Sequence, residues 1–481
     1  MATFGLAACG SGGDRGPINV AVIGEEEAPF QRGVRLSAAA QHLRAATNEG
    51  LVGLDPAGQI IPAIAERWIV TDDGLSYIFR LRDTTWPDGE ALTAAEVRLL
   101  FRESLRQLDG TSLGLDLAKV TEVRAMTGRV IEVRLSSPMP EFLRLLAQPE
   151  LGLVQNGSGV GPMTMTRNEE GLIAELNAMP PEMRGLPARD GWEDAARDMS
   201  LRALAGPAAV EAFSSGLVDL VLNGDISTFP LAQLGPLSRG NVQVDPAQGL
   251  FGFMIRNDDG VLSDPILREA LSMAIDRSEL IEPFGLDGWR PTTWIVPQES
   301  FSPLQYPATR WSGRSIEERR AAAQQRIASW VAQNGTAPSV SVGLPEGPGS
   351  DLLFEQVSIA WEGVGLSVER LAMDEGADIE LRDRMARYSS PRWFLNQFNC
   401  SLEIGLCSPE TDTLVRESLT QKDSKLKQAL LADAHSELVA AEVFIPLGVP
   451  VRWSLVRGAV TGYQANPWGL HPLFPLVEPT I

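Results

Sequence analysis

The sequence predicts an α/β protein with more than one lobe, and three observations support this fold class. A chain of 481 residues and 52.0 kDa is too long for a single hydrophobic core. Short alternating strands and Asp-Gly turns are interleaved with helices that begin at clear capping residues. Residues 338–371 have the strand–helix–strand order of a βαβ unit, which requires parallel strands and a right-handed crossover.

The N-terminal part of the chain predicts alternating strands and a capped helix. Tyr77, Phe79 and Leu81 lie two residues apart, so they share one face of a strand. Thr93 and Glu96 have the spacing of a capping box, which satisfies free amides at the start of a helix. The strands are predicted at 17–24, 75–83 and 130–135, and the helices at 89–106 and from Pro138 onward.

A second well-marked helix is predicted after the strand at 253–257. Ser263 is expected to be its N-cap, because a hydroxyl oxygen can accept a hydrogen bond from a free amide. Pro265 fits the first turn, where no backbone amide is needed. The apolar stripe of this helix consists of Leu267, Ala270, Leu271 and Ala274.

The next helix is predicted from another capping box, formed by Ser315 and Glu318, and is expected to end at Asn334. Residues 297–314, which precede it, are rich in proline and serine and predict a loop. The βαβ unit has predicted strands at 338–344 and 365–371 around a helix at 350–362.

The composition is typical of a soluble globular protein, with 44% hydrophobic and 21% charged residues. No apolar run approaches the roughly 18 residues that a membrane-spanning helix needs. The formal net charge is −21 at pH 7, so the overall field opposes binding to a phosphate backbone. Nucleic acid is therefore not expected as a partner.

Residues 110–114, Gly-Thr-Ser-Leu-Gly, match the Gly-x-Ser-x-Gly pattern of serine hydrolases. That pattern needs a strand before the serine, a helix after it and a downstream histidine. Here it follows a helix and lies in a polar stretch that predicts a loop, and nothing ties His435 or His471 to it. A hydrolase is therefore the weaker alternative, and we expect no enzyme.

Cysteine and histidine are too few and too scattered to predict a metal site. The three histidines are far apart in the chain, and the spacing of Cys400 and Cys407 fits no common zinc pattern. We therefore expect neither a metal nor another cofactor.

Residues 1–16 resemble the cleavage region of a lipoprotein signal followed by a tether. Small residues precede Cys9, and a Gly/Ser-rich stretch follows it. In this interpretation Cys9 is lipidated and anchors the protein to a membrane. The alternative is a coincidental match, because the residues before Cys9 lack a basic segment.

Two strings far apart in the chain resemble one protein family. The first is residues 48–105, which begin Asn-Glu-Gly-Leu-Val-Gly-Leu-Asp-Pro and include Trp-Pro-Asp-Gly at 86–89. The second is residues 253–277, which end in Ala-Ile-Asp-Arg. Their wording and order are similar to those of family 5 extracytoplasmic solute-binding proteins, the peptide and nickel class that serves ABC importers.

This resemblance implies a periplasmic-binding-protein-like α/β fold, with two α/β lobes, a cleft between them and an extra α/β subdomain. The chain would cross between the lobes near 252 and 448. Lobe 1 would comprise residues 17–34, 155–252 and 448–481, the extra subdomain residues 35–154, and lobe 2 residues 253–447.

The resemblance also implies the function. Such a protein captures a peptide-like or other small solute outside the cytoplasm, in the periplasm of many bacteria, and delivers it to the permease subunits of an ABC importer. We expect it to act as a monomer. A periplasmic receptor or chaperone that keeps the fold without transport is the alternative. Dipeptide-binding members carry a short disulfide near Cys400 and Cys407, which supports that pairing here over two free thiols.

Residues 387–398 resemble the family motif Asp-Tyr-x-x-Pro-x-x-Phe-Leu-Asn, in which the aspartate holds the α-ammonium group of a bound peptide. The proline, phenylalanine, leucine and asparagine align without gaps, so Arg387 occupies the aspartate position. An arginine repels an ammonium group, but its planar donors suit a carboxylate or phosphate. We therefore expect a solute with an anionic or strongly accepting group bound to Arg387. The alternative is that Arg387 forms an internal ion pair with an acid such as Asp383 or Glu380 and faces away from the cleft.

Eight further residues are candidates for ligand contact. Aromatic side chains commonly line such pockets, but they also fill cores. Serines next to a proline donate hydrogen bonds or form a turn. The aromatic candidates are Tyr388, Trp393 and Trp294, the hydroxyl candidates are Ser389 and Ser390, and the candidates for the opposite cleft wall, or alternatively for a strand start, are Asn48, Glu49 and Gly50.

Overall fold

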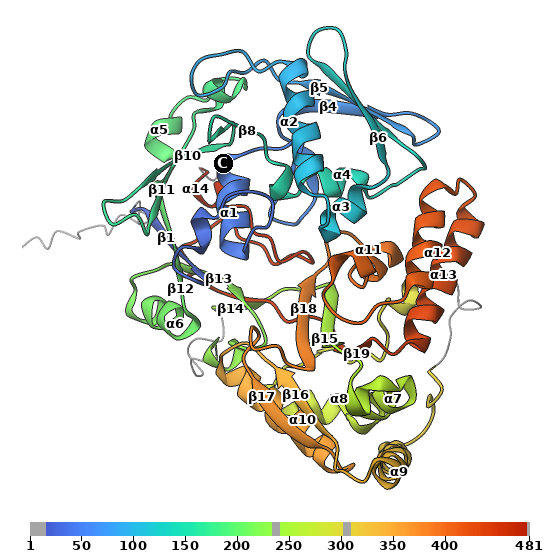
Figure 1. Cartoon of the computed structure of the whole chain (residues 1–481). Coiled ribbons are helices and arrows are strands. Elements are labelled where there is room, and N and C mark those ends of the chain that lie inside the picture. The colour runs from blue at the N-terminus through green and yellow to red at the C-terminus, as the bar shows by residue number, and fades with distance from the viewer. Residues whose placement is uncertain (1–15, 233–240, 302–308, 479–481) are drawn as a thin grey trace, which may run out of the picture.

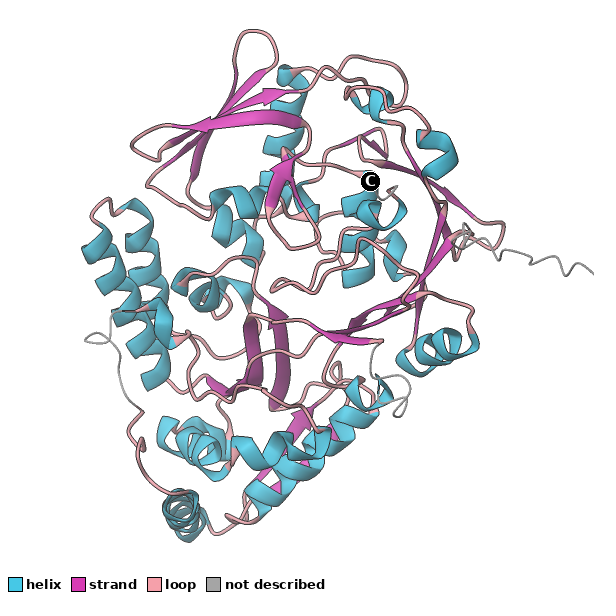
Figure 2. Ribbon diagram, turned by 180° about the vertical axis from the view of Figure 1, so that it is seen from behind, coloured by secondary structure: helices cyan, strands magenta, loops and turns pink. Residues whose placement is uncertain are grey.

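The computed structural model describes residues 16–232, 241–301 and 309–478 (Figure 1). Its strands form a seven-stranded, a five-stranded and a four-stranded sheet and two short pairs. Figure 2 shows from behind that these sheets are separate and that helices lie between and around them. No helix in the described ranges is long and apolar enough to cross a membrane. The predicted lipidation site, Cys9, lies outside the described residues.

The seven-stranded sheet has the order β10-β11-β12-β1-β13-β20-β14, and β1 pairs in parallel with both β12 and β13. Alternate residues of β1 face opposite layers, because side chains alternate along a strand. Val20 packs with helix α1 and the C-terminal segment, and Ala21 packs with helix α6. The strands are β1 (Ile18–Ile23), β10 (Met163–Arg167), β11 (Ala174–Ala178), β12 (Met199–Leu204), β13 (Leu220–Gly224), β14 (Val242–Val244) and β20 (Trp453–Val456), and the helices are α1 (Ala38–Thr47), α6 (Gly206–Ser215) and α14 (Phe474–Val477).

The five-stranded sheet has the order β17-β16-β18-β15-β19 and contains the predicted βαβ unit. Its central strand β15 is buried on both faces: Phe253 packs with helices α7 and α10, and Met254 packs with helices α11 and α13. The strands are β15 (Gly249–Ile255), β16 (Ser339–Gly343), β17 (Ser367–Leu371), β18 (Ile379–Met385) and β19 (Phe444–Gly448), and the helices are α7 (Pro265–Ala274), α8 (Arg277–Ile281), α9 (Ile316–Asn334) and α10 (Pro348–Glu362).

The four-stranded sheet, at the top of Figure 1, has the order β4-β5-β7-β6. Its apolar face, including Phe79 and Ile131, belongs to the same buried core as Trp393 of α11 and Leu431 of α13. This sheet is therefore packed against elements that are several hundred residues away in the sequence. The elements are β4 (Ala65–Val70), β5 (Ser76–Leu81), β6 (Val120–Ala125), β7 (Val130–Leu135), α2 (Ala94–Gln107), α3 (Ser112–Leu117), α4 (Phe142–Leu146), α11 (Pro391–Asn396), α12 (Pro409–Thr420) and α13 (Ser424–Ala440).

The chain passes twice between the seven-stranded and five-stranded sheets. The first passage is residues 245–248, between β14 and β15, and lies just before the expected crossing near 252. The second is residues 449–452, between β19 and β20, next to the expected crossing near 448. The remaining short elements are β2 (Val52–Leu54), β3 (Ile60–Pro62), β8 (Val154–Gln155), β9 (Ser158–Gly159) and α5 (Trp192–Ala195).

Most local predictions are confirmed. Tyr77, Phe79 and Leu81 are buried on one face of β5. Both capping boxes form, and α9 ends at Asn334 because the following glycine adopts a left-handed conformation with φ 73°. The structure also contains the Cys400–Cys407 disulfide, with a Cα–Cα distance of 5.3 Å.

Three local predictions are wrong in detail. The N-cap of α7 is Asp264 and not Ser263, because the Asp264 carboxylate accepts the amide of Ile266 at 2.8 Å, and the preceding residues form a separate 3-10 turn. Helix α4 begins at Phe142, four residues later than its proline-rich start suggests. Helix α2 begins only after Thr93, since Asp88–Glu90 forms a turn.

Candidate functional site

The four-stranded sheet and helices α2 to α4 are called the four-stranded subdomain below. A cavity of 600 Å³ lies where this subdomain, the seven-stranded sheet and the five-stranded sheet meet. Four segments provide most of its wall: the start of α1, the start of α3, the end of β18 and the turn before the C-terminal helix α14. In residue numbers these segments are 34–42, 110–113, 382–387 and 468–470. The cavity is therefore built from parts of the chain that belong to both predicted lobes.

β18 has a free edge where it reaches the cavity. On one side it pairs with β15 along its whole length, but on the other side β16 pairs with only its first two residues. Ala386 N donates to Gln248 O at 2.8 Å, and every second peptide group of β18 faces β15, so the peptide groups of Asp383 and Met385, beyond the residues paired with β16, point away from β15. Among the described residues these groups have no recorded backbone partner. An extended ligand could supply one.

Arginines dominate the charged groups of the cavity wall, in a chain whose net charge is −21. Two of the arginines are paired with carboxylates: Arg452 Nη1 lies 2.8 Å from Asp383 Oδ2, and Arg387 Nη2 lies 3.4 Å from Glu150 Oε1. The charged lining residues are Arg35, Arg382, Arg384, Arg387 and Arg452 on one hand and Glu150 and Asp383 on the other.

Arg387 lines this cavity and also forms an internal ion pair, with Glu150 and not with either acid considered from the sequence. Besides the contact with Glu150, its Nη1 donates to the Ser112 hydroxyl at 3.1 Å. The two acids considered as internal partners are engaged elsewhere, Asp383 with Arg452 and Glu380 with Arg256 at 3.4 Å. Arg387 therefore joins the segment after β18 to α3 and to the segment after α4.

Arg382 and Arg384 lie on the same face of β18, two residues apart. Among the described residues neither has an ion pair within 4.0 Å or a recorded side-chain hydrogen bond. Burial lowers the pKa of Arg382 to about 9, and the Arg384 and Arg256 cations contribute to that shift. Burial, and then the Arg387 cation, also lower the pKa of Arg384, although its side chain is open to the cavity.

A buried polar cluster holds the cavity wall in place next to Arg387. Asp116 of α3 is fully buried, and its Oδ1 accepts the Tyr388 hydroxyl at 3.0 Å and the Asn396 amide at 2.8 Å. Arg392 Nη2 donates to the Asp116 carbonyl at 2.7 Å. Burial raises the pKa of Asp116 to about 6, which the Arg392 and Arg387 cations partly oppose. Tyr388 is thus a fully buried positioning group.

The structure distributes the remaining predicted site residues over three cavities. Trp393 lines the same 600 Å³ cavity as Arg387. Trp294 and Ser389 line a 490 Å³ cavity beside β15 and β19, and Asn48, Glu49 and Gly50 line a 450 Å³ cavity near α1 and α14. Ser390 is the residue before α11, and neither it nor Tyr388 lines any of these cavities.

Glu49 belongs to a compact ion cluster. Its side chain forms ion pairs with Arg82 and, at 3.3 Å, with Arg184, and all three side chains are largely buried. Asn48 donates from Nδ2 to the Leu153 carbonyl at 3.3 Å. These contacts connect the end of α1 to the four-stranded subdomain.

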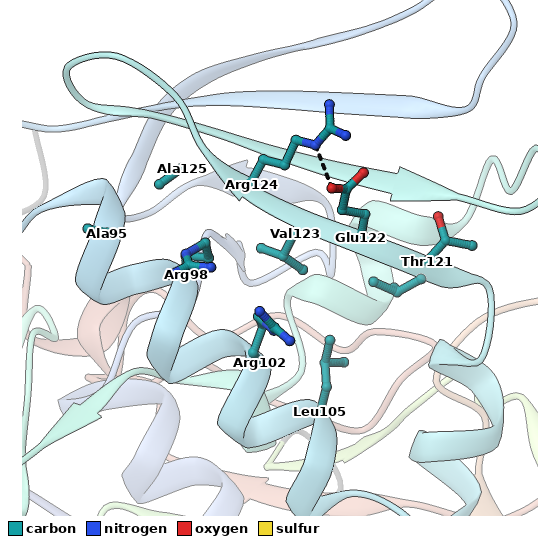
Figure 3. Close-up of a pocket in the computed structure, with 10 residues that line it drawn as sticks. Ala95, Arg98, Arg102, Leu105, Thr121, Glu122, Val123, Arg124 and Ala125 are labelled. Atoms are coloured by element: carbon teal, nitrogen blue, oxygen red, sulfur yellow. Dashed lines mark hydrogen bonds and ion pairs between the residues drawn. The ribbon is translucent and has the colours of Figure 1, made fainter.

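A further cavity of 680 Å³ lies on the outer side of the four-stranded subdomain, between α2 and the edge strand β6 (Figure 3). Arg98 and Arg102 extend from α2 toward it, and Glu122 and Arg124 of β6 form an ion pair at 2.6 Å. None of the predicted site residues lines this cavity.

The Gly-x-Ser-x-Gly segment does not form the predicted loop. Thr111 caps α3 by accepting the Gly114 amide at 3.0 Å, so Ser112 is the first residue of a helix. The Ser112 hydroxyl accepts from Arg387 and has no recorded contact with a histidine among the described residues. Within residues 16–232, 241–301 and 309–478, no group of three or more His, Cys, Asp or Glu side chains could hold a metal ion.

Sequence reasoning missed most of the polar residues around the cavity. Arg382, Arg384 and Arg452 have no motif of their own, and Glu150 and Asp116 are distant in sequence from the residues that they contact. The Arg-Asp-Arg run within 379–385 was an available signal, since a strand places its first and third residues on one face.

Comparison with known proteins gives a consistent result. The family model for the middle region of bacterial extracellular solute-binding proteins, family 5, matches residues 59–180. The chain is 23% identical over 470 residues to a probable di/tripeptide-binding protein 5 of Pseudomonas aeruginosa (strain UCBPP-PA14), covering 86% of each chain. It is also 23% identical to the periplasmic oligopeptide-binding protein OppA of Escherichia coli (strain K12), covering 87% of this chain and 84% of the relative.

Among solved structures, Haemophilus influenzae OppA in complex with RPPGFSPFR matches with a TM-score of 0.80 and 19% identity, covering 97% of this chain and 99% of that chain. The predicted fold class, α/β and periplasmic-binding-protein-like, is therefore confirmed. The named relatives are binding proteins and not enzymes. The matched family model, relatives aligned over most of the chain and the shared fold all point the same way: the chain is similar to family 5 of the bacterial extracellular solute-binding proteins.

Proposed function

We propose that this chain is the solute-binding component of an ABC importer and captures an extended, peptide-like solute in the 600 Å³ cavity. The observation that carries the proposal is the free edge of β18. Its outward peptide groups border a cavity of suitable size and lack partners among the described residues. An extended peptide satisfies such an edge by adding one more strand, which supplies affinity through the main chain.

Ligand capture works by closure of two lobes in this proposal. Lobe 1 comprises residues 17–34, 155–252 and 448–481, and lobe 2 comprises residues 253–447. A solute that touches both sides of the cavity stabilises the closed arrangement over the open one, because its contacts are complete only when the lobes meet. The two passages at 245–248 and 449–452 are short enough to act as hinges. The closed protein then docks on the permease subunits.

Arg387 is a proposed ligand contact. It lines the cavity, and Glu150 and Ser112 engage only part of the five N–H donors that an arginine carries. Its remaining donors suit a carboxylate or a carbonyl of the solute, and its positive charge disfavours a free ammonium group nearby. Trp393 from the same wall would pack against the solute.

The location follows from the same proposal. The protein works as a monomer in the periplasm or outside the cell membrane, held there through a lipid on Cys9. A receptor or chaperone that keeps the fold without transport is the second candidate. The presence of adjacent permease genes in the genome distinguishes the two.

A thermal-shift panel on the purified chain tests the function. The probes are trialanine with a free amine, N-acetyl-trialanine and N-succinyl-trialanine. A ligand at 100 times its dissociation constant adds about 2.7 kcal/mol of stability, which is easily measured. Stabilisation by the blocked or succinylated peptides supports the peptide receptor with Arg387 at the ligand. Stabilisation only by the free-amine peptide removes Arg387 from the site, and no shift with any peptide overturns the proposed function.

A further inference from the structure

The geometry points to acidic peptides with a Glu-x-Glu or Asp-x-Asp pattern as the preferred solutes, their two carboxylates bound by Arg382 and Arg384. This inference names the solute class of the cavity described above and rests on the proposed function. It concerns two arginines that neither the Arg387 motif nor any other sequence pattern singled out.

The first step is that neither arginine has an ion pair within 4.0 Å or a side-chain hydrogen bond in the described chain, so Glu380 and Asp383 compensate their charges only in part and from a greater distance. The nearby carboxylates form their ion pairs with other arginines: Asp383 binds Arg452, Glu150 binds Arg387, and Glu380 binds Arg256, although one oxygen each of Asp383 and Glu150 has no hydrogen-bond partner among the described residues. The Nε of Arg382 is buried without a hydrogen-bond partner. A largely desolvated cation without an ion pair is costly, so the site favours a ligand that brings negative charge.

The second step is that the neighbours of the pair increase its positive potential. Burial lowers the pKa of both arginines most, and nearby cations lower it further, Arg384 and Arg256 at Arg382 and Arg387 at Arg384, while Glu380 and Asp383 partly oppose these shifts. Arg35 lines the same cavity and donates to the Gly110 carbonyl at 3.4 Å. The charged side chains of the cavity wall are therefore mostly positive, although the protein as a whole is acidic.

The third step is the spacing. Arg382 and Arg384 are two residues apart on one strand, so they project from the same face about 7 Å apart along it. A peptide that adds to the free edge of β18 has the same period, and alternate side chains of neighbouring strands lie side by side. Acidic residues at positions i and i+2 of the peptide therefore meet the two guanidinium groups, each of which can form a bidentate contact.

Isothermal titration with matched peptides tests the inference. The probes are N-acetyl-Glu-Ala-Glu-amide, its neutral analogue N-acetyl-Gln-Ala-Gln-amide, and N-acetyl-Glu-Glu-Ala-amide, which has the same charge in another pattern. Glutarate tests whether two carboxylates suffice without a peptide. We expect the Glu-Ala-Glu peptide to bind at least 10-fold more tightly than the neutral one and several-fold more tightly than the Glu-Glu-Ala peptide.

The variant R382Q/R384Q should lose this preference while still binding the neutral peptide. R98Q is the matched control, because Arg98 lies on α2 at the outer cavity of Figure 3, and this variant should retain the preference. In the absence of ligand, R382Q should melt at a higher temperature than the wild type, since it removes a half-buried cation whose buried Nε has no hydrogen-bond partner in the described chain. That readout does not depend on any peptide.

Equal binding of the charged and neutral peptides overturns the inference and leaves the proposed function standing. Binding of glutarate but of no peptide overturns the peptide pattern. If no peptide binds, including the neutral one, the proposed function itself fails. Equal affinities for the two acidic peptides overturn the strand-addition geometry, and a lower melting temperature for unliganded R382Q contradicts the incomplete compensation of its charge.

Discussion

Single buried side chains decide how distant segments meet in this protein, and Asp116 is the clearest case. Its carboxylate joins α3 to Tyr388, in the segment between β18 and α11, and to Asn396, the last residue of α11. Only one of its oxygens is used, since Oδ2 has no hydrogen-bond partner among the described residues. The group therefore acts mainly as an acceptor, and its negative charge is a cost that burial makes larger.

Replacement of Asp116 separates these two roles. We expect Asp116→Ala to lower the free energy of unfolding by about 3 kcal/mol, because it leaves the Tyr388 hydroxyl and the Asn396 amide buried without an acceptor. Asp116→Asn keeps the accepting oxygen and removes the charge, so its effect should stay within about 1 kcal/mol. Urea unfolding at pH 7.5 measures both. Equal losses in the two variants would show that the charge, and not the acceptor, matters.

At the scale of elements, the helices obey local rules that are independent of the rest of the fold. Ser315 and Thr93 each accept the amide of the glutamate three residues later, and each glutamate bonds back to the capping residue. Both caps are at the surface, where tertiary packing contributes little. The capping energy therefore comes almost entirely from the free amides of the first turn.

Removal of a cap should have a modest and separable effect. Ser315→Ala and Thr93→Ala should each lower the free energy of unfolding by about 1 kcal/mol, with additive losses in the double variant, because the two helices belong to different sheets. Ser329→Ala, in the exposed middle of α9, is the control and should be neutral or slightly stabilising. Urea midpoints give the comparison. A neutral Ser315→Ala variant would contradict the capping role.

The disulfide loop is another element-scale feature, and it borders the candidate site. Leu402 and Ile404 lie inside the Cys400–Cys407 loop and line the 600 Å³ cavity. The double variant Cys400→Ser/Cys407→Ser should lose about 2 to 3 kcal/mol, since the crosslink restricts the unfolded chain. Addition of dithiothreitol to the wild type should give the same loss and should not affect the variant. Insensitivity of the wild type to reductant would contradict the contribution of the bond.

At the scale of the whole molecule, a hydrogen bond between His471 and His42 joins the C-terminal segment to helix α1. His42 of α1 is buried, its Nδ1 lies 2.7 Å from the Ala38 carbonyl, and its Nε2 accepts the backbone amide of His471 at 3.3 Å. His471 in turn contacts Asp245, at the first passage between the sheets, at 3.1 Å. The donor and acceptor pattern requires a neutral His42 ring. Burial accordingly lowers the pKa of His42 to about 4.

This arrangement predicts a loss of stability in acid. His42 has a pKa of about 6.5 when unfolded and about 4 when folded, so between these values the unfolded state binds more protons. The free energy of unfolding should therefore fall as the pH decreases from 6.5 to 4, by about 2 kcal/mol between pH 7 and pH 5 from this residue. His42→Asn should show a smaller pH dependence than the wild type in urea unfolding. An unchanged slope would contradict the role of His42.

The sequence by itself determined the local structure, because strands, caps and turns depend on residues within a few positions of each other. The alternation of Tyr77, Phe79 and Leu81, both capping boxes and the βαβ unit are examples. The exceptions were boundaries such as Asp264, where two adjacent residues could both cap the helix. The family resemblance added the fold class and the kind of function.

Only the tertiary structure decided the composition of the candidate site. Arg387 meets Glu150, and Tyr388 meets Asp116, across more than 200 residues of chain, as sequence separations of 237 and 272 show. Glu49, which resembles a cleft residue of the family, and Trp294, an aromatic candidate, line other cavities. The free edge of β18 exists only because β16 stops after two paired residues. Such features depend on which strands become neighbours, and no local pattern encodes that choice.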